Sequence, residues 1–172
     1  MIILGGVHGV GKSYFCSLLK QNVHMTTYSA SKLIAKQKQI TLPKDKYTKD
    51  INENQQHLIT AIRTLERRTS KYLLDAHFCL LDEHGNIIKL PQTIFDQIQP
   101  KAILILTEDA ETIARRRKER DNIIVSTQQI ETHQEAECTH SLTVAKTLKI
   151  PHKICRGATE YPNAISYIES IL

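Results

Sequence analysis

Long hydrophobic runs and large aromatic side chains are both scarce in this sequence of 172 residues. It contains no Trp, three Phe and six Tyr, so we expect a core built mainly from aliphatic side chains. No apolar run approaches the roughly 18 residues of a membrane-spanning helix. The first apolar run, residues 1–4, is too short for a signal peptide and follows no basic segment. The sequence therefore predicts a soluble, cytoplasmic protein with no membrane partner.

Paired cysteines are also missing. The four cysteines, Cys16, Cys79, Cys138 and Cys155, are far apart, and none has the C-x-x-C spacing of zinc and redox sites. We interpret them as reduced thiols of a cytoplasmic protein. The sequence has no internal repeat or low-complexity tract, and its length suits one domain spanning residues 1–172.

Positive charge exceeds negative charge only moderately. The 23 Lys and Arg outnumber the 18 Asp and Glu, which gives a net charge of +5 and a pI near 9.0. Such a balance occurs both in nucleic-acid-binding proteins and in domains that hold a polyphosphate. No cluster of Lys and Arg is interleaved with aromatic residues, the pattern that favours single-stranded nucleic acid. We therefore favour a nucleotide ligand and keep nucleic acid as the alternative partner.

A glycine-rich segment near the start carries the strongest functional signal. Residues 6–13, Gly-Val-His-Gly-Val-Gly-Lys-Ser, fit the phosphate-binding motif G-x-x-x-x-G-K-[ST] between an apolar run and a helical pattern. In such a loop, backbone N–H groups and a helix N-terminus surround phosphate oxygens. Lys12 would reach the β- and γ-phosphates of ATP, and the Ser13 hydroxyl would bind Mg²⁺. The predicted nucleotide-binding residues are Gly6, Gly9, Val10, Gly11, Lys12 and Ser13.

Short apolar runs alternate with segments of helical periodicity along the rest of the chain. Core strands are predicted at residues 1–4, 23–28, 72–75, 102–106 and 153–155, with a β-hairpin at 78–81 and 87–90. Helices are predicted at residues 13–20, 32–38, 49–68, 91–98, 107–120, 126–148 and 162–172, and a mobile loop at 39–48. This alternation is typical of an α/β fold with a parallel sheet covered by helices on both faces.

Asp75 is the second candidate for the nucleotide site. It ends the apolar run 72–74, and ligands of open α/β sheets bind at the carboxyl ends of the strands. A carboxylate there can hold Mg²⁺ or accept a proton from a bound nucleophile. Asp75 is therefore both a catalytic and a metal-binding candidate, and the alternative is an Asp that caps the following turn. His77 could face the same cleft or have a structural role.

Four arginines lie between residues 115 and 120, and the helical pattern places Arg116 and Arg120 on one face. Phosphoryl transfer depends on cations that neutralise the transferring group, and the planar guanidinium binds its oxygens in pairs. We predict Arg116 and Arg120 as catalytic residues, alongside Lys12 and Asp75. The alternative is a solvated basic helix face.

Histidines elsewhere give weaker signals. His8 lies inside the glycine-rich loop, where side chains often point away from the phosphates. His133, Glu137 and His140 recur at helical spacing on one stripe. A metal site there would need a fourth ligand and a dry setting, so we expect this stripe to be solvated.

These segments together are similar to P-loop nucleoside monophosphate kinases, above all to the archaeal-type adenylate kinases with short lids. The resemblance rests on residues 6–13, Leu-Asp-Ala-His at 74–77, the arginine-rich 115–121, and Ile-Glu-Thr-His-Gln-Glu at 130–135. It implies a three-layer P-loop NTPase fold, a five-stranded parallel sheet ordered 2-3-1-4-5, and transfer of the ATP γ-phosphoryl to a nucleotide with Mg²⁺. By the same resemblance, residues 29–69 form the acceptor-binding region and 115–135 the lid.

One part of the sequence departs from that family. Similar kinases clamp the acceptor phosphate with arginines, whereas residues 14–62 contain no Arg and offer only lysines and histidines. Lysine binds phosphate as a point charge and cannot form the paired contacts of a guanidinium. The acceptor thus remains open between a nucleotide and a nucleoside. The alternative is an NTP-hydrolysing or NTP-sensing regulator without a small-molecule acceptor, associated in one version with nucleic acid.

Overall fold

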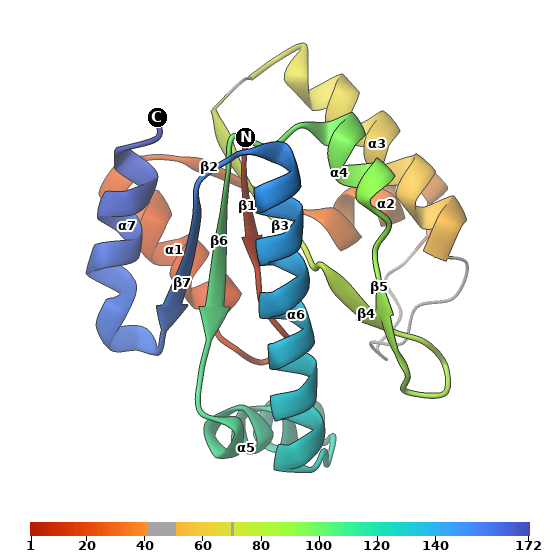
Figure 1. The fold of residues 1–172 in the computed structure, drawn as a ribbon, viewed down its shortest axis with the longest axis vertical. Helices are drawn as coiled ribbons and strands as arrows, with labels where there is room; N and C mark the ends of the chain where they lie inside the picture. Colours follow the sequence, from red (N-terminus) through yellow and green to blue (C-terminus); the bar gives the residue numbers. More distant parts are fainter. Residues whose placement is uncertain (41–50, 70) are drawn as a thin grey trace.

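The chain forms a twisted sheet between two layers of helices (Figure 1). The computed structural model describes residues 1–40, 51–69 and 71–172. Five parallel strands, ordered β2-β3-β1-β6-β7, make up the sheet: β1 (Ile2–Gly5), β2 (Thr26–Ser29), β3 (Tyr72–Asp75), β6 (Ala102–Thr107) and β7 (His152–Arg156). Counted in chain order within this sheet, the order is 2-3-1-4-5. The strands β4 (Cys79–Leu81) and β5 (Ile87–Lys89) pair antiparallel as a separate hairpin.

Helices cover both faces of the sheet. Their bounds are α1 (Lys12–Val23), α2 (Ala30–Lys38), α3 (Ile51–Glu66), α4 (Gln92–Ile98), α5 (Ala110–Asp121), α6 (Thr127–Leu148) and α7 (Tyr161–Glu169). Helices α1 and α7 lie on one side, and α3, α4 and α6 on the other (Figure 1). A short 3-10 turn, Ala158–Glu160, precedes α7. Among the described residues, no helix combines the length and the apolar character that crossing a membrane requires.

The core consists of two apolar layers, one on each face of the sheet. Side chains alternate along a strand, so Ile3 packs with α3 and α6 while Ile2 and Leu4 pack with α1 and α7. All four residues of β1 are buried, because a parallel sheet between helices has no solvent-facing side. This explains why the central strands β1, β3 and β6 appear in the sequence as continuous apolar runs, whereas the edge strands β2 and β7 are more polar. The expected α/β fold with a parallel sheet flanked by helices is confirmed.

The carboxyl ends of all five strands meet at one edge of the sheet, where α5 lies across them (Figure 1). The register pairs Leu4 with Asp75 and Gly5 with Ile105, so the ends of β3 and β6 flank the end of β1. The glycine-rich loop after β1 therefore emerges in the middle of this edge, between Asp75 and the segment that leads into α5.

Several element boundaries differ from those expected from the sequence. The second strand begins at Thr26 rather than at residue 23, because α1 continues to Val23 before His24 adopts a left-handed conformation. The helix of the arginine cluster begins at Ala110, where the Asp109 carboxylate accepts the Thr112 N–H. Ser126 and Gln129 do form a capping box at the start of α6. The predicted loop at residues 39–48 and the first residues of the predicted helix 49–68 lie largely outside the described residues.

Candidate functional site

Glycines shape the loop between β1 and α1. Gly6, Gly9 and Gly11 have φ values of 132°, 85° and 112°, a region that side chains with a Cβ rarely adopt. A Cβ at Gly6 would lie 2.6 Å from the Leu106 carbonyl oxygen, and one at Gly11 would lie 2.8 Å from the Tyr161 hydroxyl. The loop therefore needs glycine both for its backbone conformation and for its close approach to neighbouring segments.

Lys12, the first residue of α1, folds back beneath the loop. Its ammonium donates to the Gly6 carbonyl and, at 3.4 Å, to the Val7 carbonyl, and it lies 3.8 Å from Asp75 Oδ1. The residue is 9% exposed, and burial lowers the pKa of its ammonium, an effect that the charges of Asp75 and Glu137 oppose. Lys12 is thus a buried side chain between the loop carbonyls and Asp75.

Asp75 lies at the end of β3, next to β1 in the sheet. Burial raises the pKa of its carboxyl, while the charges of Lys12 and Lys32 lower it. The Asp75 side chain keeps 22% of its surface exposed, and Ser13, at the start of α1, is exposed. The carboxylate of Asp75 and the hydroxyl of Ser13 are therefore both accessible. Such hard oxygen donors suit Mg²⁺, which proteins bind through one or two carboxylates together with substrate phosphates. The described residues contain no cluster of three or more His, Cys, Asp or Glu side chains that could hold a metal ion.

Glu137 lies under the loop and not on a solvated surface. The expectation that the stripe of His133, Glu137 and His140 is solvated is therefore wrong. Glu137 is 0% exposed and accepts the N–H of Gly6 at 3.1 Å. It also accepts the N–H groups of Phe78, at 3.0 Å, and Cys79, at 2.7 Å. The physical reason is that Glu137 lies on the buried face of α6, together with Ile130 and Val144.

The two histidines of the stripe make structural contacts. The His133 ring nitrogen lies 3.2 Å from the Cys79 carbonyl oxygen, and burial lowers the pKa of this buried imidazole. The His140 ring nitrogen lies 2.7 Å from the Leu90 carbonyl oxygen. His77 Nδ1 is 3.8 Å from Glu137 Oε1, so His77 lies beside the same carboxylate. His133 and His140 therefore connect α6 to the backbone at the two ends of the hairpin formed by β4 and β5.

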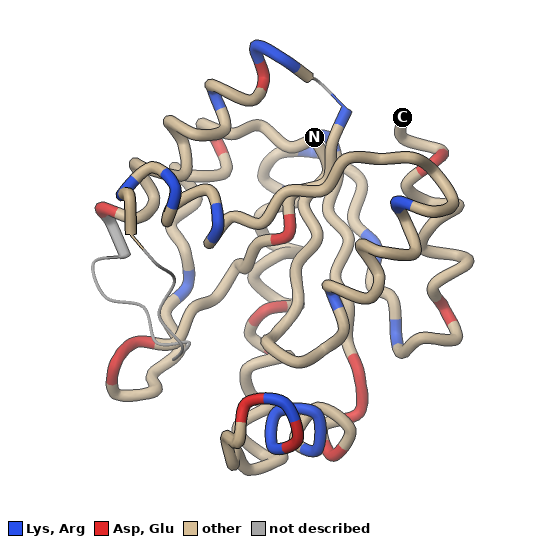
Figure 2. Tube along the Cα trace, turned by 180° about the vertical axis from the view of Figure 1, so that it is seen from behind, with Lys and Arg blue, Asp and Glu red and all other residues tan. Residues whose placement is uncertain are grey.

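The arginines of α5 contact the glycine-rich loop from outside; α5 carries a concentration of basic residues at this end of the molecule (Figure 2). Arg116 donates to the Val10 carbonyl at 3.2 Å and to Glu108 at 3.2 Å. Arg117, which the sequence did not single out, is the buried one, and its Nε donates to the His8 carbonyl at 2.8 Å. Arg115 is exposed on the outer face. The helix thus holds the loop through Arg116 and Arg117 together.

Arg120 forms a separate cluster with two partners. Its guanidinium donates to both oxygens of Asp121, at 3.0 and 2.7 Å, and lies 2.5 Å from His8 Nε2. His8 Nε2 is also 2.9 Å from Asp121 Oδ2. The contacts with Arg120 and His8 hold the pKa of the Asp121 carboxyl far below its ordinary value. Arg116 and Arg120, expected to act as one face, therefore have different partners in this structure.

Signals for the two missed residues were present in the sequence, but they were weak. Glu137 lies at helical spacing from Ile130 and Val144, which marks a buried face, yet its polar neighbours suggested solvent. Arg117 could not be distinguished from Arg116, because only the packing of α5 decides which arginine turns inward. The predicted functional roles of the loop residues, Asp75, Arg116 and Arg120 remain predictions; the structure brings all of them to one edge.

The whole fold is shared with known kinases. The chain is similar to the shikimate kinase from Bacteroides thetaiotaomicron, with a TM-score of 0.59 and 10% identity, covering 98% of this chain and 96% of that one. The shikimate kinase from Aquifex aeolicus vf5 gives a TM-score of 0.58 and 13% identity, covering 98% and 93%. A gluconokinase from Sinorhizobium meliloti 1021 gives a TM-score of 0.52 and 12% identity, covering 98% of this chain and 89% of that one. At such low identities, these likenesses establish the fold alone.

A comparison of sequences identifies the family to which the chain belongs. No curated protein matches the chain significantly. The finer resemblance to archaeal-type adenylate kinases is not confirmed, since the similar structures named above are kinases of other kinds. Residues 5–134, which contain the glycine-rich loop, Asp75 and the arginines of α5, match the protein family described as AAA domain. Because this match covers well over half of the sequence, the chain belongs to that family of P-loop domains.

Proposed function

We propose that this protein is a small-molecule kinase that transfers the γ-phosphoryl group of ATP, with Mg²⁺, to a small acceptor. The observation that carries the proposal is the pairing of Lys12 with Asp75 across 3.8 Å, at the edge where β1 and β3 end side by side. A phosphate-binding loop alone would suit any NTPase. A carboxylate beside its lysine, on the neighbouring strand, adds a group that can receive the proton of an acceptor hydroxyl.

The chemistry follows from these positions. The acceptor oxygen attacks the γ-phosphorus, the bond to the β,γ-bridging oxygen breaks, and ADP leaves with the electron pair. The hydroxyl proton of the acceptor passes to an Asp75 carboxylate oxygen. Lys12 and the loop amides of Gly9, Val10 and Gly11 bind the phosphates and neutralise their charge. Mg²⁺, held by Ser13 and Asp75, would neutralise the phosphate oxygens and orient the triphosphate.

The lid and the acceptor region are assigned by position. In this proposal, residues 115–135 form the lid, and Arg116 and Arg120 exchange their present partners for phosphate oxygens when ATP is bound. Residues 29–69 form the acceptor-binding region, of which 41–50 lie outside the described residues. Lys32 is exposed on α2 and its charge acts on Asp75, so it is the cation we assign to the acceptor side. Its single point charge leaves both a nucleotide and a nucleoside as candidate acceptors.

One observation favours a second function, ATP hydrolysis without a small acceptor. Residues 14–62 contain no Arg, so the paired contacts that clamp a monophosphate have no arginine to make them there. The loop, Lys12 and Asp75 would then activate water in place of an acceptor hydroxyl.

The four free cysteines suit a reducing compartment, so we place either activity in the cytoplasm.

A direct assay separates the two functions. The protein is incubated with Mg-ATP and a panel of nucleosides, nucleoside monophosphates and small hydroxy acids, and the products are identified by mass spectrometry. The kinase proposal predicts a phosphorylated acceptor and ADP in equal amounts, both lost in Lys12→Ala and retained in Lys20→Ala, an exposed position on the same helix. ADP and inorganic phosphate released at one rate with every compound would contradict it.

A further inference from the structure

Gln55 on α3 is a buried polar side chain that the transfer chemistry described above does not use. It lies three, four and seven residues before Leu58, Ile59 and Ile62, which belong to the core, so it shares their inward face of the helix. Gln55 is 5% exposed, whereas its neighbour Gln56 is exposed. Gln55 is therefore a glutamine at a position where the helical pattern favours an apolar residue.

The amide oxygen of Gln55 has no hydrogen-bond donor. Within residues 1–40, 51–69 and 71–172, Gln55 Oε1 is shielded from solvent and accepts no hydrogen bond. A buried carbonyl oxygen without a donor lowers stability, and native proteins contain few of them. The Tyr72 hydroxyl is also buried and unpaired, but Tyr72 begins β3 at the amino edge of the sheet. Gln55 therefore destabilises the free protein, and its position suggests what it is for.

Gln55 lies on the acceptor side of the proposed site. Helix α3 ends at Glu66 and a short connection leads to the start of β3, so the first turns of α3 lie toward the edge at which β3 ends in Asp75 (Figure 1). The inward face of α3 shares one apolar layer with Ala30 and Ala76, which follow β2 and β3 at that edge. Gln55, one turn before the first core residue of α3, is therefore the polar group of this layer on the acceptor side.

We propose that Gln55 is a specificity-determining residue of the acceptor site, whose Oε1 accepts a hydrogen bond from an N–H or O–H group of the acceptor. The inference deepens the proposed function and rests on it, because it requires a small acceptor. A buried amide oxygen favours a compound that brings a donor and rejects an analogue that lacks it. The acceptor therefore carries a polar hydrogen besides that of the hydroxyl that attacks ATP.

The acceptor reaches this oxygen between the ends of two helices. Lys38 Nζ, at the end of α2, lies 2.9 Å from Glu53 Oε2 and 3.2 Å from Asn54 Oδ1, the two residues before Gln55. Glu53 is exposed, and exposed ion pairs contribute little to stability. Separation of the two helix ends by a ligand is therefore a small change, and it opens the way to the Gln55 amide.

The first test needs no acceptor. Gln55→Met replaces the amide with an apolar side chain of similar length, so the unpaired oxygen is removed from the free protein. We expect the midpoint of thermal unfolding to rise by about 4 °C. Gln56→Met, at the exposed neighbouring position, is the matched control and should shift it by less than about 1 °C. A midpoint of Gln55→Met no higher than that of the wild type would show that the amide is paired within the fold and would overturn the proposal.

The second test compares acceptors that differ by one donor in Mg-ATP turnover. Adenosine and purine riboside differ by an amino group, as guanosine and inosine do, and each nucleoside differs from its 2′-deoxy form by a hydroxyl. We expect one such loss to lower kcat/KM of the wild type at least about tenfold, and the amino and hydroxyl pairs distinguish an N–H from an O–H donor. In Gln55→Met the same loss should change kcat/KM less than about threefold, because its partner is gone. An equal loss in both proteins would overturn the proposal.

A second variant, Gln55→Asn, covers the case in which Gln55→Met does not fold. It keeps the amide but shortens the side chain by one methylene group, so the oxygen no longer reaches the acceptor. We expect KM for the phosphorylated nucleoside to rise at least about tenfold and KM for ATP to stay unchanged, as in Gln55→Met.

The outcomes separate this inference from the proposed function. An unchanged KM for the nucleoside in the folded Gln55 variants would overturn the inference and leave the kinase activity standing. A wild-type protein that phosphorylated no compound of the panel would contradict the proposed function itself, and the role of Gln55 in recognising an acceptor would be overturned with it.

Discussion

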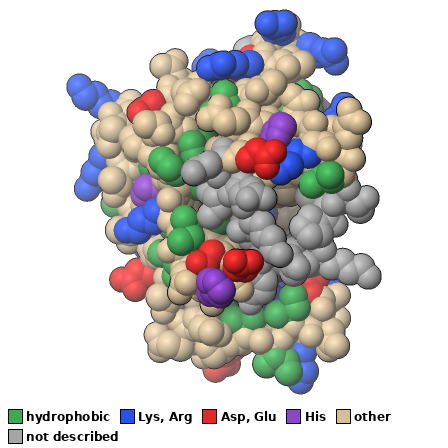
Figure 3. Space-filling model, turned by 90° about the vertical axis from the view of Figure 1, so that its right-hand side faces the viewer, with side chains coloured by type: hydrophobic (Ala, Val, Ile, Leu, Met, Phe, Trp, Pro, Cys, Tyr) green, Lys and Arg blue, Asp and Glu red, His purple; other side chains and the backbone are tan. Residues whose placement is uncertain are grey.

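The two sides of the proposed site, the loop 6–13 with its contacts from α5 and α6 (the ATP side) and the helices α2 and α3 (the acceptor side), differ in where their charged side chains lie. On the ATP side, buried contacts from α5 and α6 reach the loop, and Arg117 and Glu137 each bond to its backbone. On the acceptor side, Ala30 of α2 and Ile62 of α3 belong to the core. At the surface of these helices Lys38 lies 2.9 Å from Glu53. Figure 3 shows one side of the molecule with charged side chains of both signs and histidines scattered over it. In the proposal, the ATP side therefore has buried ionisable side chains, while the described part of the acceptor side has exposed ones such as Lys32.

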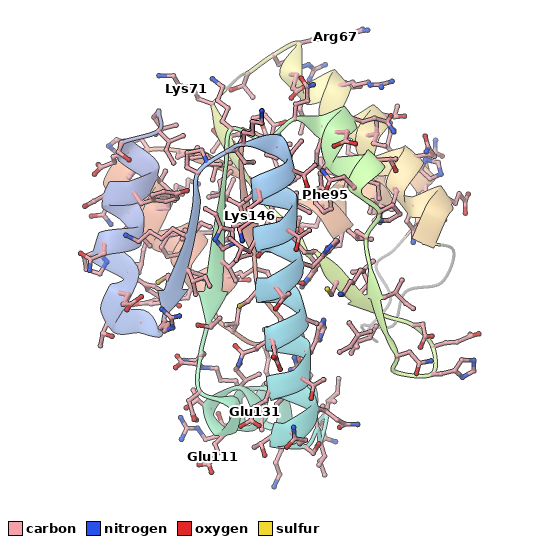
Figure 4. All side chains as sticks on the ribbon, in the orientation of Figure 1. Arg67, Lys71, Phe95, Glu111, Glu131 and Lys146 are labelled. Atoms are coloured by element: carbon pink, nitrogen blue, oxygen red, sulfur yellow. The ribbon has the colours of Figure 1, made fainter. Side chains whose placement is uncertain are left out.

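The distribution of basic residues supports this contrast. Arg67 and Lys71 lie at the end of the molecule opposite to Glu111 and Glu131, which mark the outer surfaces of α5 and α6 (Figure 4). The net charge of +5 therefore does not arise from the loop edge alone. What distinguishes the ATP side is the burial of its ionisable side chains, because Lys12 is 9% exposed and Glu137 is 0% exposed.

The largest effect is expected from Lys12→Ala. Removal of a buried cation that contacts the transferring group costs about 10³-fold in turnover, by analogy with the loss of one electrostatic contact at a transition state. Steady-state ADP formation with Mg-ATP measures it, with Lys20→Ala as the control. A Lys12→Ala protein that kept more than a tenth of the wild-type rate would remove Lys12 from the site.

Glu137→Ala should cost the most stability. It leaves buried N–H groups of Gly6, Phe78 and Cys79 without their acceptor, so the free energy of unfolding should fall by about 3–5 kcal/mol. Urea unfolding followed by circular dichroism measures the change. Glu169→Ala, at an exposed position, should change it by less than about 0.5 kcal/mol. Similar losses of unfolding free energy in both variants would show that the buried contacts of Glu137 stabilise the fold no more than an exposed side chain does.

Asp75→Asn should lower turnover about 10²-fold, because the amide cannot take up the proton of the hydroxyl group that attacks ATP. Its shape is retained, so ATP affinity should change much less than turnover. Comparison of kcat with the calorimetric Kd for ATP separates the two effects, and the Mg²⁺ concentration needed for half-maximal rate should rise. An unchanged Mg²⁺ requirement together with an unchanged rate would exclude Asp75 from the site.

Removal of the lid charges tests whether α5 serves catalysis beyond holding the loop. Arg116→Ala combined with Arg120→Ala should reduce kcat by about tenfold or more while weakening ATP binding less. The variant Arg115→Ala, which changes an exposed arginine of the same helix, is the control. Equal losses in kcat and in ATP affinity would make Arg116 and Arg120 binding residues only.

The smallest effect is expected on the acceptor side. Lys32→Ala should raise KM for the acceptor by about tenfold or less, because it removes one exposed point charge. The KM for ATP should not change. Steady-state kinetics with each substrate varied in turn provides both numbers. A rise in the KM for ATP alone would show that α2 belongs to the ATP side, and the contrast between the two sides would fail.

The sequence could predict the features of this molecule that depend on local patterns. The loop at residues 6–13 follows from its glycines. The central strands β1, β3 and β6 follow from continuous apolar runs, because both of their faces are buried. The Ser126 cap likewise depends on neighbours in the chain. Glu137 escaped prediction because its partners, Gly6 and Phe78, lie 131 and 59 residues away, and nothing local distinguishes a buried carboxylate from a solvated one. The choice between Arg116 and Arg117 also depends on how α5 packs.

The central claim is that the loop passes phosphate to a small molecule and not to water. Turnover of Mg-ATP in H₂¹⁸O, with the accepted compound present, tests it most directly. Transfer to an acceptor forms the new P–O bond with the oxygen of that acceptor, so mass spectrometry should find a phosphorylated product without ¹⁸O and little labelled inorganic phosphate. If all the phosphate released carried one ¹⁸O atom and no phosphorylated acceptor formed, the protein would be a hydrolase and the account would be contradicted.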